Sequence, residues 1–424
     1  MESPDTHRAI EAVWRIESAR LVAGLARWSR NVDLAEELAQ EALVTALEKW
    51  PETGVPDNPG AWLMATAKRK GIDRFRKVQL HERKQDEIVY ELDGVPVPHE
   101  EELVAGLDDD VGDDLLRLVF TACHPVLSTE ARVALTLRLL GGLTTPEIAR
   151  AFLVPEPTVA QRIVRAKKSL ADARVPYEVP RGEELAARLA SVLEVVYLVF
   201  NEGYAATAGE DWIRPSLCNE ALRLGRILAG LAPAEPEVHG LVALMEIQAS
   251  RLPARTGPDG EPILLLDQDR ARWDRLLVRR GLAALERAVR LGGARGPYLL
   301  QAEIAACHAR ARTAAETDWS RIAAFYAELA TVAPSPVVEL NRAVAVGMAE
   351  GPAAGLERVD RLRDEPKLRG YHLLPAVRAD LLAKLGRLEE ARAELERAVT
   401  LTRNEREIAL LRERAARLGE SSAG

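Results

Sequence analysis

Apolar residues along this chain recur mostly at helical spacing rather than in the strict alternation of a half-buried strand. In the first 77 residues this period predicts three helices, at His7 to about Ser29, Leu34 to Trp50, and Pro59 to Lys77. Further helical zones follow at 113–173 and 183–424. Aromatic residues make up only 4% of the chain, and Val and Ile seldom alternate with polar residues. The pattern therefore predicts an all-α protein.

Two breaks in this pattern divide the chain. The segment 78–112 turns strongly acidic from Asp86, and neither Lys nor Arg occurs between Asp86 and Asp114. With few large apolar groups, this segment is predicted to be a flexible linker rather than a carboxylate-rich cation site. The stretch VPYEVP after Arg174 predicts a short hinge. The predicted divisions are 1–77, 78–112, 113–173, 174–182 and 183–424.

The residues from Leu143 to Lys168 predict a short helix, a tight turn and a second helix. Thr144 and Thr145 are N-cap candidates, with Pro146 and Glu147 suited to the first turn. The second helix carries an apolar stripe and, away from it, amide and cationic groups, which is the kind of helix that the major groove of DNA admits. The stripe is Val159, Ile163 and Ala166, and the polar groups are Gln161, Arg162, Arg165, Lys167 and Lys168. The alternative is an ordinary helical hairpin with a solvated cationic end.

A second candidate nucleic-acid surface lies upstream. Leu34–Trp50 is amphipathic: Leu34, Leu38, Ala42 and Leu47 are expected to face inward, and Glu36, Glu37, Gln40 and Glu41 to form an acidic-polar face.

After a Pro/Gly loop, Asn58 is expected to cap a helix that begins at Pro59. This helix carries the cations Lys68, Arg69, Lys70, Arg74, Arg76 and Lys77, opposed only by Asp73. Such a surface can follow a phosphate backbone and hold an unstacked base. A solvated face is the alternative for the cations, and core packing is favoured for both Trp50 and Trp62.

Charge and cysteine content narrow the class of protein. A net charge of −8 argues against a chain that coats nucleic acid nonspecifically, although local basic patches still bind phosphate. Cys123, Cys218 and Cys307 are widely spaced, which predicts reduced structural thiols and no metal site. No apolar run approaches about 18 residues, and the N-terminus lacks a signal-peptide stretch. We therefore expect a cytoplasmic protein without a membrane partner.

The C-terminal region shows faint repetition. LERAVRL (285–291), LERVDRL (356–362) and LERAVTL (395–401) recur, and residues 379–401 place small or apolar side chains where a tetratricopeptide hairpin needs them. A looser copy lies at 340–362. Stacked helical hairpins suit binding rather than chemistry. The alternative is a generic helical domain with similar composition throughout.

These motifs together resemble a known family. DLAEELAQEAL, AWLMATAKRKGIDRFRK and LTTPEIARAFLVPEPTVAQRIVRAKKSL, in this order, resemble the two core modules of bacterial RNA polymerase sigma factors of the extracytoplasmic-function group. The C-terminal region resembles the helical, tetratricopeptide-like extension of one subgroup, through YLVFNEGY (197–204), DQDRARWD (267–274) and GPYLLQAEIAACHA (296–309).

The resemblance implies a protein that binds core RNA polymerase and promoter DNA, with a possible protein or ligand partner for the extension. It implies that Glu37, Gln40 and Glu41 contact polymerase. For the −10 promoter element it implies Asn58, Lys68, Arg69, Asp73, Arg74 and Arg76. For the −35 element it implies Thr158, Gln161, Arg162, Arg165, Lys167 and Lys168, with both lysines on the DNA backbone. The chain departs from the family at Lys68-Arg69-Lys70, where a polar pair such as Asn-Leu is usual, so promoter preference does not carry over.

Two other classes of function are weighed against this one. A conventional helix-turn-helix regulator with a helical sensing domain would bind operator DNA without polymerase, but it has no need of the basic helix at 59–77. The sequence holds no phosphate-cradling Gly loop, paired metal-ligand motif or nucleophile elbow, so neither an enzyme nor a cofactor is expected. For Glu202, Asp267, Asp269 and Arg270 a buried salt-bridge network is favoured over an acid site.

Overall fold

The computed structural model describes the backbone of residues 4–85 and 111–422, apart from 153, 207, 210, 211 and 259. Nearly all regular structure in this part of the chain is helical, which confirms the predicted all-α fold. Two short strands, β1 (Ala208–Gly209) and β2 (Arg403–Asn404), pair in parallel. Most of the predicted acidic linker lies outside the described residues. No helix within the described ranges is both long and apolar enough to cross a membrane.

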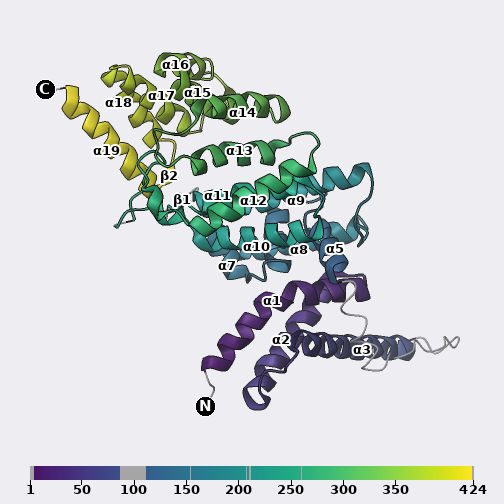
Figure 1. Ribbon diagram of the computed structural model, residues 1–424. Helices are drawn as coiled ribbons and strands as arrows, with labels where there is room; N and C mark the ends of the chain where they lie inside the picture. The colour runs from purple at the N-terminus through teal and green to yellow at the C-terminus, as the bar shows by residue number, and fades with distance from the viewer. Residues whose placement is uncertain are drawn as a thin grey trace. The chain divides into compact units, whose positions relative to one another are not determined.

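The chain forms two compact units, Met1–Val195 and Val196–Gly424. The N-terminal unit is drawn in purple to blue in Figure 1. Its helices are α1 (Pro4–Ser29), α2 (Val32–Thr53), α3 (Pro59–Gln85), α5 (Val111–Ala122), α6 (Thr129–Leu139), α7 (Thr145–Phe152) and α8 (Glu156–Asp172). Helix α9 (Glu183–Tyr204) contains the boundary between the units.

Helices α1, α2 and α3 pack against one another around small residues and one indole. Trp50 is almost fully buried and meets the half-buried Trp62 edge to face, with ring centroids 5.2 Å apart, so core packing is the structural role of both. A side chain at Gly71 would collide with Trp28, because a Cβ there would lie 2.7 Å from the indole. Glycine at this position therefore lets α3 cross close to α1.

Two expectations for these helices need correction. Leu47 does not face inward, because 37% of it is exposed, whereas Leu38 and Ala42 are buried as expected. Helix α3 continues to Gln85, past the expected end at Lys77, since neither Gly nor Pro interrupts that stretch. The first residues of the predicted linker, 78–85, are therefore helical.

The start of α9 belongs to the N-terminal unit. Arg188 Nη2 donates to Phe120 O at 2.8 Å, and Ser191 Oγ donates to Cys123 O at 2.6 Å. Arg132 adds an ion pair with Glu194 at 3.0 Å. The predicted hinge, 174–182, lies outside helices, and the compact units separate further along, at Val195. The predicted domain limits themselves stay predictions.

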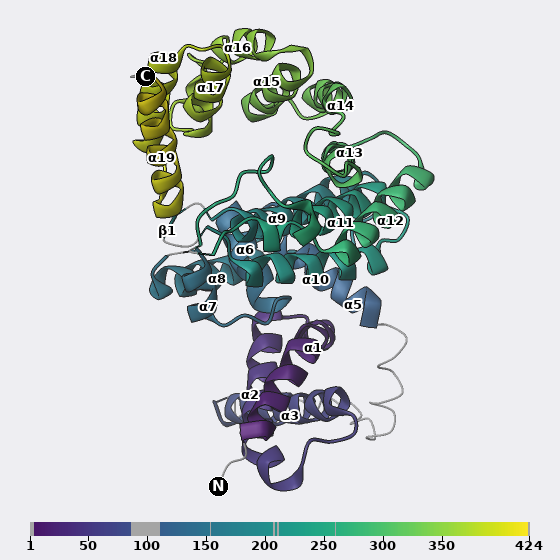
Figure 2. The same cartoon turned by 60° about the vertical axis from the view of Figure 1, so that its left-hand side comes forward.

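The C-terminal unit is built from consecutive helices, most of which pack chiefly on the helix before or after them in sequence. They are α10 (Pro215–Leu231), α11 (Pro236–Ala249), α12 (Arg275–Leu291), α13 (Pro297–Arg310), α14 (Trp319–Val332), α15 (Pro336–Glu350), α16 (Pro352–Asp360), α17 (Leu373–Lys384), α18 (Leu388–Val399) and α19 (Glu405–Ser422). Within the described residues, the 3₁₀ turns η1 (Leu252–Ala254), η2 (Arg270–Arg272) and η3 (Pro366–Leu368) lie between these helices. Figure 2 shows α13 to α19 following one another in an arc.

Both predicted repeat units are helical hairpins. Residues 379–401 fall on α17 and α18, which are joined through Gly386 at φ +75°, and Ala379, Leu382 and Leu395 are buried between them. The looser copy falls on α15 and α16. Their backbones meet at two glycines, since a Cβ on Gly355 would lie 2.8 Å from Gly347 Cα. The small residues of the repeats thus mark the helix crossings.

All three cysteines are buried and unpaired. Burial raises the pKa of the Cys123 thiol to about 11 and that of Cys218 to about 12, and it also raises the pKa of Cys307.

Candidate functional site

The helix-turn-helix begins with a reciprocal cap. Glu147 Oε2 accepts hydrogen bonds from Thr144 N at 2.7 Å and from Thr144 Oγ1 at 2.8 Å, while Glu147 N donates to Thr144 Oγ1. This is a capping box, which satisfies backbone donors that the first turn of α7 leaves open. The cap fixes where α7 starts and hence how it braces α8.

The paired helices bury one side and expose the other. Ile148 and Ala149 on α7 are buried, as are Val159, Ile163 and Ala166 on α8. On the opposite side of α8, three of the predicted DNA-binding side chains, Gln161, Arg165 and Lys168, are exposed, while Thr158 and Arg162 are half-buried. A helix braced in this way can enter a major groove with its amide and guanidinium groups foremost.

The basic helix α3 starts as the sequence predicts and presents its cations on the surface. Asn58 Oδ1 accepts from Ala61 N at 3.1 Å, so this side chain serves as the N-cap. Arg69, Asp73, Arg74 and Arg76 are exposed. Lys68 is half-buried, and burial together with Arg27 lowers its pKa.

The acidic face of α2 lies against this basic helix. Glu37 Oε2 and Arg74 Nη1 are 2.5 Å apart, and each side chain is about half exposed. An ion pair this exposed contributes about 1 kcal/mol at most. Glu37 and Arg74 can therefore be separated at little energetic cost. Glu41, beside them, is exposed.

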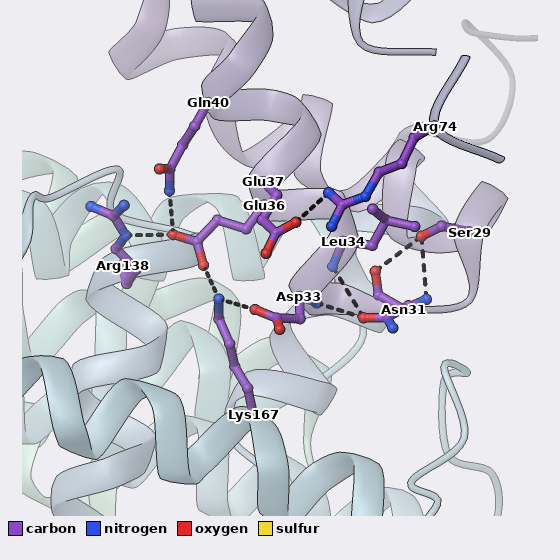
Figure 3. A network of polar contacts seen from close by, with 10 residues as sticks. All are labelled: Ser29, Asn31, Asp33, Leu34, Glu36, Glu37, Gln40, Arg74, Arg138 and Lys167. Carbon is purple, nitrogen blue, oxygen red and sulfur yellow. Dashed lines mark hydrogen bonds and ion pairs between the residues drawn. The ribbon is translucent and has the colours of Figure 1, made fainter. Parts of the chain in front are cut away.

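Glu36 has a different position from the rest of its predicted face. It is buried, and Figure 3 shows it reaching from α2 to Arg138 on α6 and Lys167 on α8. Its Oε1 accepts from Arg138 Nε at 2.6 Å and from Gln40 Nε2 at 2.7 Å, and its Oε2 lies 2.6 Å from Lys167 Nζ. Lys167 also donates to Asp33 Oδ1 at 2.6 Å. Although burial acts to lower the pKa of Lys167, Glu36 and Asp33 together raise it above its ordinary value.

A second polar contact joins the same groups of helices. The buried Asp114 on α5 lies 2.5 Å from Arg117 and 3.5 Å from Arg27 on α1. The Tyr177 hydroxyl is shared between Ala23 O at 3.0 Å and Asp114 O at 3.1 Å, and burial raises its pKa. Helices α1–α3 and α5–α8 are thus held together partly by charged groups.

The polar cluster around Glu36 contains some residues that the sequence analysis assigned to other roles and some that it did not identify. Lys167, expected on the DNA backbone, is paired with two carboxylates, and Gln40, expected at polymerase, donates to Glu36. Asp33 and Arg138 were not identified as site residues. No local pattern signals them, because their partners lie about a hundred residues away along the chain.

Two helical modules, one with a helix-turn-helix and one with a basic helix, define a class of protein that contacts DNA at more than one place. Comparison with known proteins shows which family of this class the chain resembles. The model for sigma-70 region 2 matches residues 16–80, and the model for sigma-70 region 4 matches residues 117–170. A family of unknown function, DUF6596, matches residues 188–289. The uncharacterized protein R00370 of Rhizobium meliloti (strain 1021) is 45% identical over 394 residues, which cover 92% of this chain and 91% of that protein.

The chain therefore belongs to the sigma-70 factors, with a helical C-terminal domain of unknown function added to regions 2 and 4. Sigma-70 factors bind core RNA polymerase, recognise promoters and are transcription factors rather than enzymes. The match to region 2 covers α3 as far as residue 80, and a conventional operator-binding regulator does not need this helix.

Proposed function

We propose that this protein is an alternative sigma factor of the extracytoplasmic-function type, acting in the cytoplasm, whose two modules read the −10 and −35 promoter elements. The observation that carries the proposal is the pairing of a capped helix-turn-helix, with Gln161 and Arg165 exposed, and a separate basic helix with exposed cations. Two DNA-contacting modules on one chain suit promoter recognition at two positions.

In vitro transcription with bacterial core RNA polymerase on a library of promoter fragments tests this function. Start sites that depend on the added protein support it and give both promoter elements. If no transcript forms while the protein alone binds duplex DNA, a conventional regulator with a helical sensing domain replaces the proposal.

Gln161, Arg162 and Arg165 are proposed to contact the −35 element, with Thr158 at the start of the helix and Lys168 on the DNA backbone. Lys167 is proposed to join the backbone contacts once it leaves Asp33 and Glu36. The exposed side of α8 supports this assignment because the opposite side is buried against the rest of the module. Scanning each position of the −35 element against variants of these residues tests it, since loss of a base contact relaxes specificity at one position.

The −10 element is proposed to meet the start of α3, through Asn58 and its loop, and the exposed Arg69, Asp73, Arg74 and Arg76. Lys68 is proposed to approach a phosphate. Burial and the positive charge of Arg27 both disfavour its charged form, and a nearby phosphate would offset this. Permanganate footprinting of the melted promoter tests the assignment. Charge-neutral variants of Arg69, Arg74 and Arg76 are expected to reduce strand opening, whereas neutralising Lys49, an exposed cation on α2, is not.

Glu37, Gln40 and Glu41 are proposed to bind core polymerase. Glu37→Lys with Glu41→Lys should abolish co-elution with the core enzyme, because both side chains are exposed on α2. Glu48→Lys with Glu52→Lys is the matched control, since it reverses two exposed charges on the same helix. Equal co-elution of both double variants with the core enzyme would remove this assignment.

The C-terminal unit is proposed to regulate the sigma modules through a protein or ligand partner. Its stacked hairpins support a binding role. A shortened chain should end at Tyr204, because Arg188 and Ser191 of α9 bond to the N-terminal unit and a cut at the hinge would remove them. If the chain 1–204 and the full chain transcribe identically under all conditions, the extension has no regulatory role.

A further inference from the structure

The C-terminal unit buries three arginines near the connection between α11 and α12. Arg251, Arg255 and Arg270 are only 6%, 9% and 7% exposed. Among the described residues, no carboxylate lies within ion-pair distance of any of them, and the Nε of each has no hydrogen-bond acceptor. Buried guanidinium groups normally have a charged partner, so each of these needs a separate explanation.

Carbonyl groups explain two of the three. Arg255 donates to Tyr204 O at 2.9 Å and stacks 3.8 Å from the centre of the Tyr204 ring. Arg270 donates to Ala311 O at 2.8 Å, to His308 O and to Thr317 Oγ1 at 3.1 Å. These carbonyls lie at the ends of α9 and α13, where helices carry partial negative charge. Arg255 and Arg270 therefore serve the fold.

Arg251 has no such explanation. None of its side-chain nitrogens makes a hydrogen bond with a described residue, and the one aromatic face near the guanidinium group within the described residues is that of Trp273, 5.6 Å from the guanidinium carbon. The same indole lies 5.0 Å from Arg270, so two cations share one ring. The attraction of one aromatic face does not repay the desolvation of a guanidinium with a like charge beside it.

The surroundings of Arg251 favour a negative charge. Burial, with the charges of Arg251 and Arg270, lowers the pKa of His308 to about 3, so this imidazole stays neutral, and its Nδ1 is buried without a partner. The charge of Glu316 acts to raise the pKa of Arg270. Glu316 itself is exposed, and its Oε2 accepts a hydrogen bond from Arg312 N at 3.2 Å. The DQDR motif forms neither the buried salt-bridge network expected for it nor an acid site, because Asp267 and Asp269 are exposed and Asp269 caps η2 through Ala271 N.

We propose that Arg251 anchors a site for the oxyanion group of a small ligand, a carboxylate or a phosphate, beside Trp273 and within the positive field of Arg270. Nε is the buried nitrogen of Arg251 that lacks a partner, while its two terminal nitrogens retain contact with solvent and make no hydrogen bond. A fork of two N–H groups is the arrangement that binds an oxyanion in bidentate fashion. The site goes beyond the proposed function and gives the extension a ligand class.

Calorimetric titration of the full chain tests the site, with sodium phosphate in one arm and sodium acetate in the other at constant ionic strength set by sodium chloride. Saturable binding is expected in at least one arm, and the arm that binds identifies the oxyanion. Arg251→Met keeps the length of the side chain without its charge and should weaken binding by about tenfold or more.

Thermal unfolding separates a binding role from a structural one. Without phosphate or acetate, Arg251→Met should raise the Tm by about 2 °C or more, because an unpaired buried charge is removed. The control Arg270→Met should lower the Tm, since it loses three acceptors. A lower Tm for Arg251→Met, equal anion binding by that variant, or no binding of either anion by the native chain would each overturn the site. Neither readout depends on transcription, so the proposed function is tested separately.

Discussion

Glu36→Gln is the change that most directly tests whether charged contacts keep α1–α3 packed against α5–α8. The protein is called closed when these two groups of helices are in contact and open when they are separated. The side chain keeps its shape and its ability to accept from Arg138, but it loses the charge that faces Lys167 2.6 Å away. Glu36 is only 8% exposed at its side chain, and Lys167 16%. We therefore expect the contact between α1–α3 and α5–α8 to be weakened, because a largely desolvated ion pair is lost.

The size of the effect follows from these contacts. Removing one partner of a buried ion pair typically costs about 3–5 kcal/mol. Asp33 still pairs with Lys167, and the amide still accepts from Arg138, so about 2 kcal/mol is expected here. That shifts the ratio of closed to open protein by roughly 30-fold. Opening also frees Lys167 for a DNA phosphate.

Two measurements on the free full-length protein follow the shift. Fluorophores at Glu52→Cys on α2 and Asp172→Cys on α8 report the separation of the two modules, and titration with a −35 duplex reports DNA affinity. Glu36→Gln should increase the separation and tighten DNA binding. Glu48→Gln, which neutralises an exposed acid on the same helix, is the control. If Glu36→Gln and Glu48→Gln behave alike in both assays, the contact does not restrain the modules, although the protein can still be a sigma factor.

Three further predictions concern other parts of the chain. Arg162→Ala with Arg165→Ala should cost about 2–6 kcal/mol of promoter affinity in a filter-binding titration, whereas Arg275→Ala with Arg279→Ala, two exposed arginines on α12, should cost little. Gly355→Ala should destabilise the hairpin of α15 and α16 by about 1–3 kcal/mol in urea unfolding, because its Cβ meets backbone; an unchanged midpoint would contradict the close crossing. Acidification from pH 6.5 towards 3 should destabilise the native chain more than His308→Gln, since below 6.5 the unfolded imidazole takes up a proton that the folded one, with a pKa of about 3, excludes; parallel loss of stability in both would refute this.

Local chemistry in the sequence predicted the elements well. Thr144 with Glu147 and Asn58 with Pro59 predicted two helix starts, because a cap involves only neighbouring residues. Helical spacing predicted the buried stripe of α8. Where a helix end depended on composition, as at Lys77, the prediction stopped too early, since a polar stretch without Gly or Pro can remain helical.

The contacts between distant segments were beyond this reasoning. Glu36 lies at an acidic position of an amphipathic helix, so its period places it in solvent, and only Arg138 and Lys167 make its burial tolerable. Leu47 shows the reverse, an apolar residue left exposed at an expected core position. Arg251 gave no signal either, because its unusual feature is the absence of a partner in three dimensions.

The buried cysteines make the native chain suitable for site-specific chemistry. Only a thiolate attacks a maleimide, and thiols whose pKa lies at about 11 or 12 are almost wholly protonated at neutral pH. Cys307 is also buried and has a raised pKa. A cysteine introduced at an exposed position such as Asp172 would therefore react well before the native thiols. Reporter groups for both modules can be attached to an otherwise unaltered sequence, with no cysteine-free background to build and revalidate.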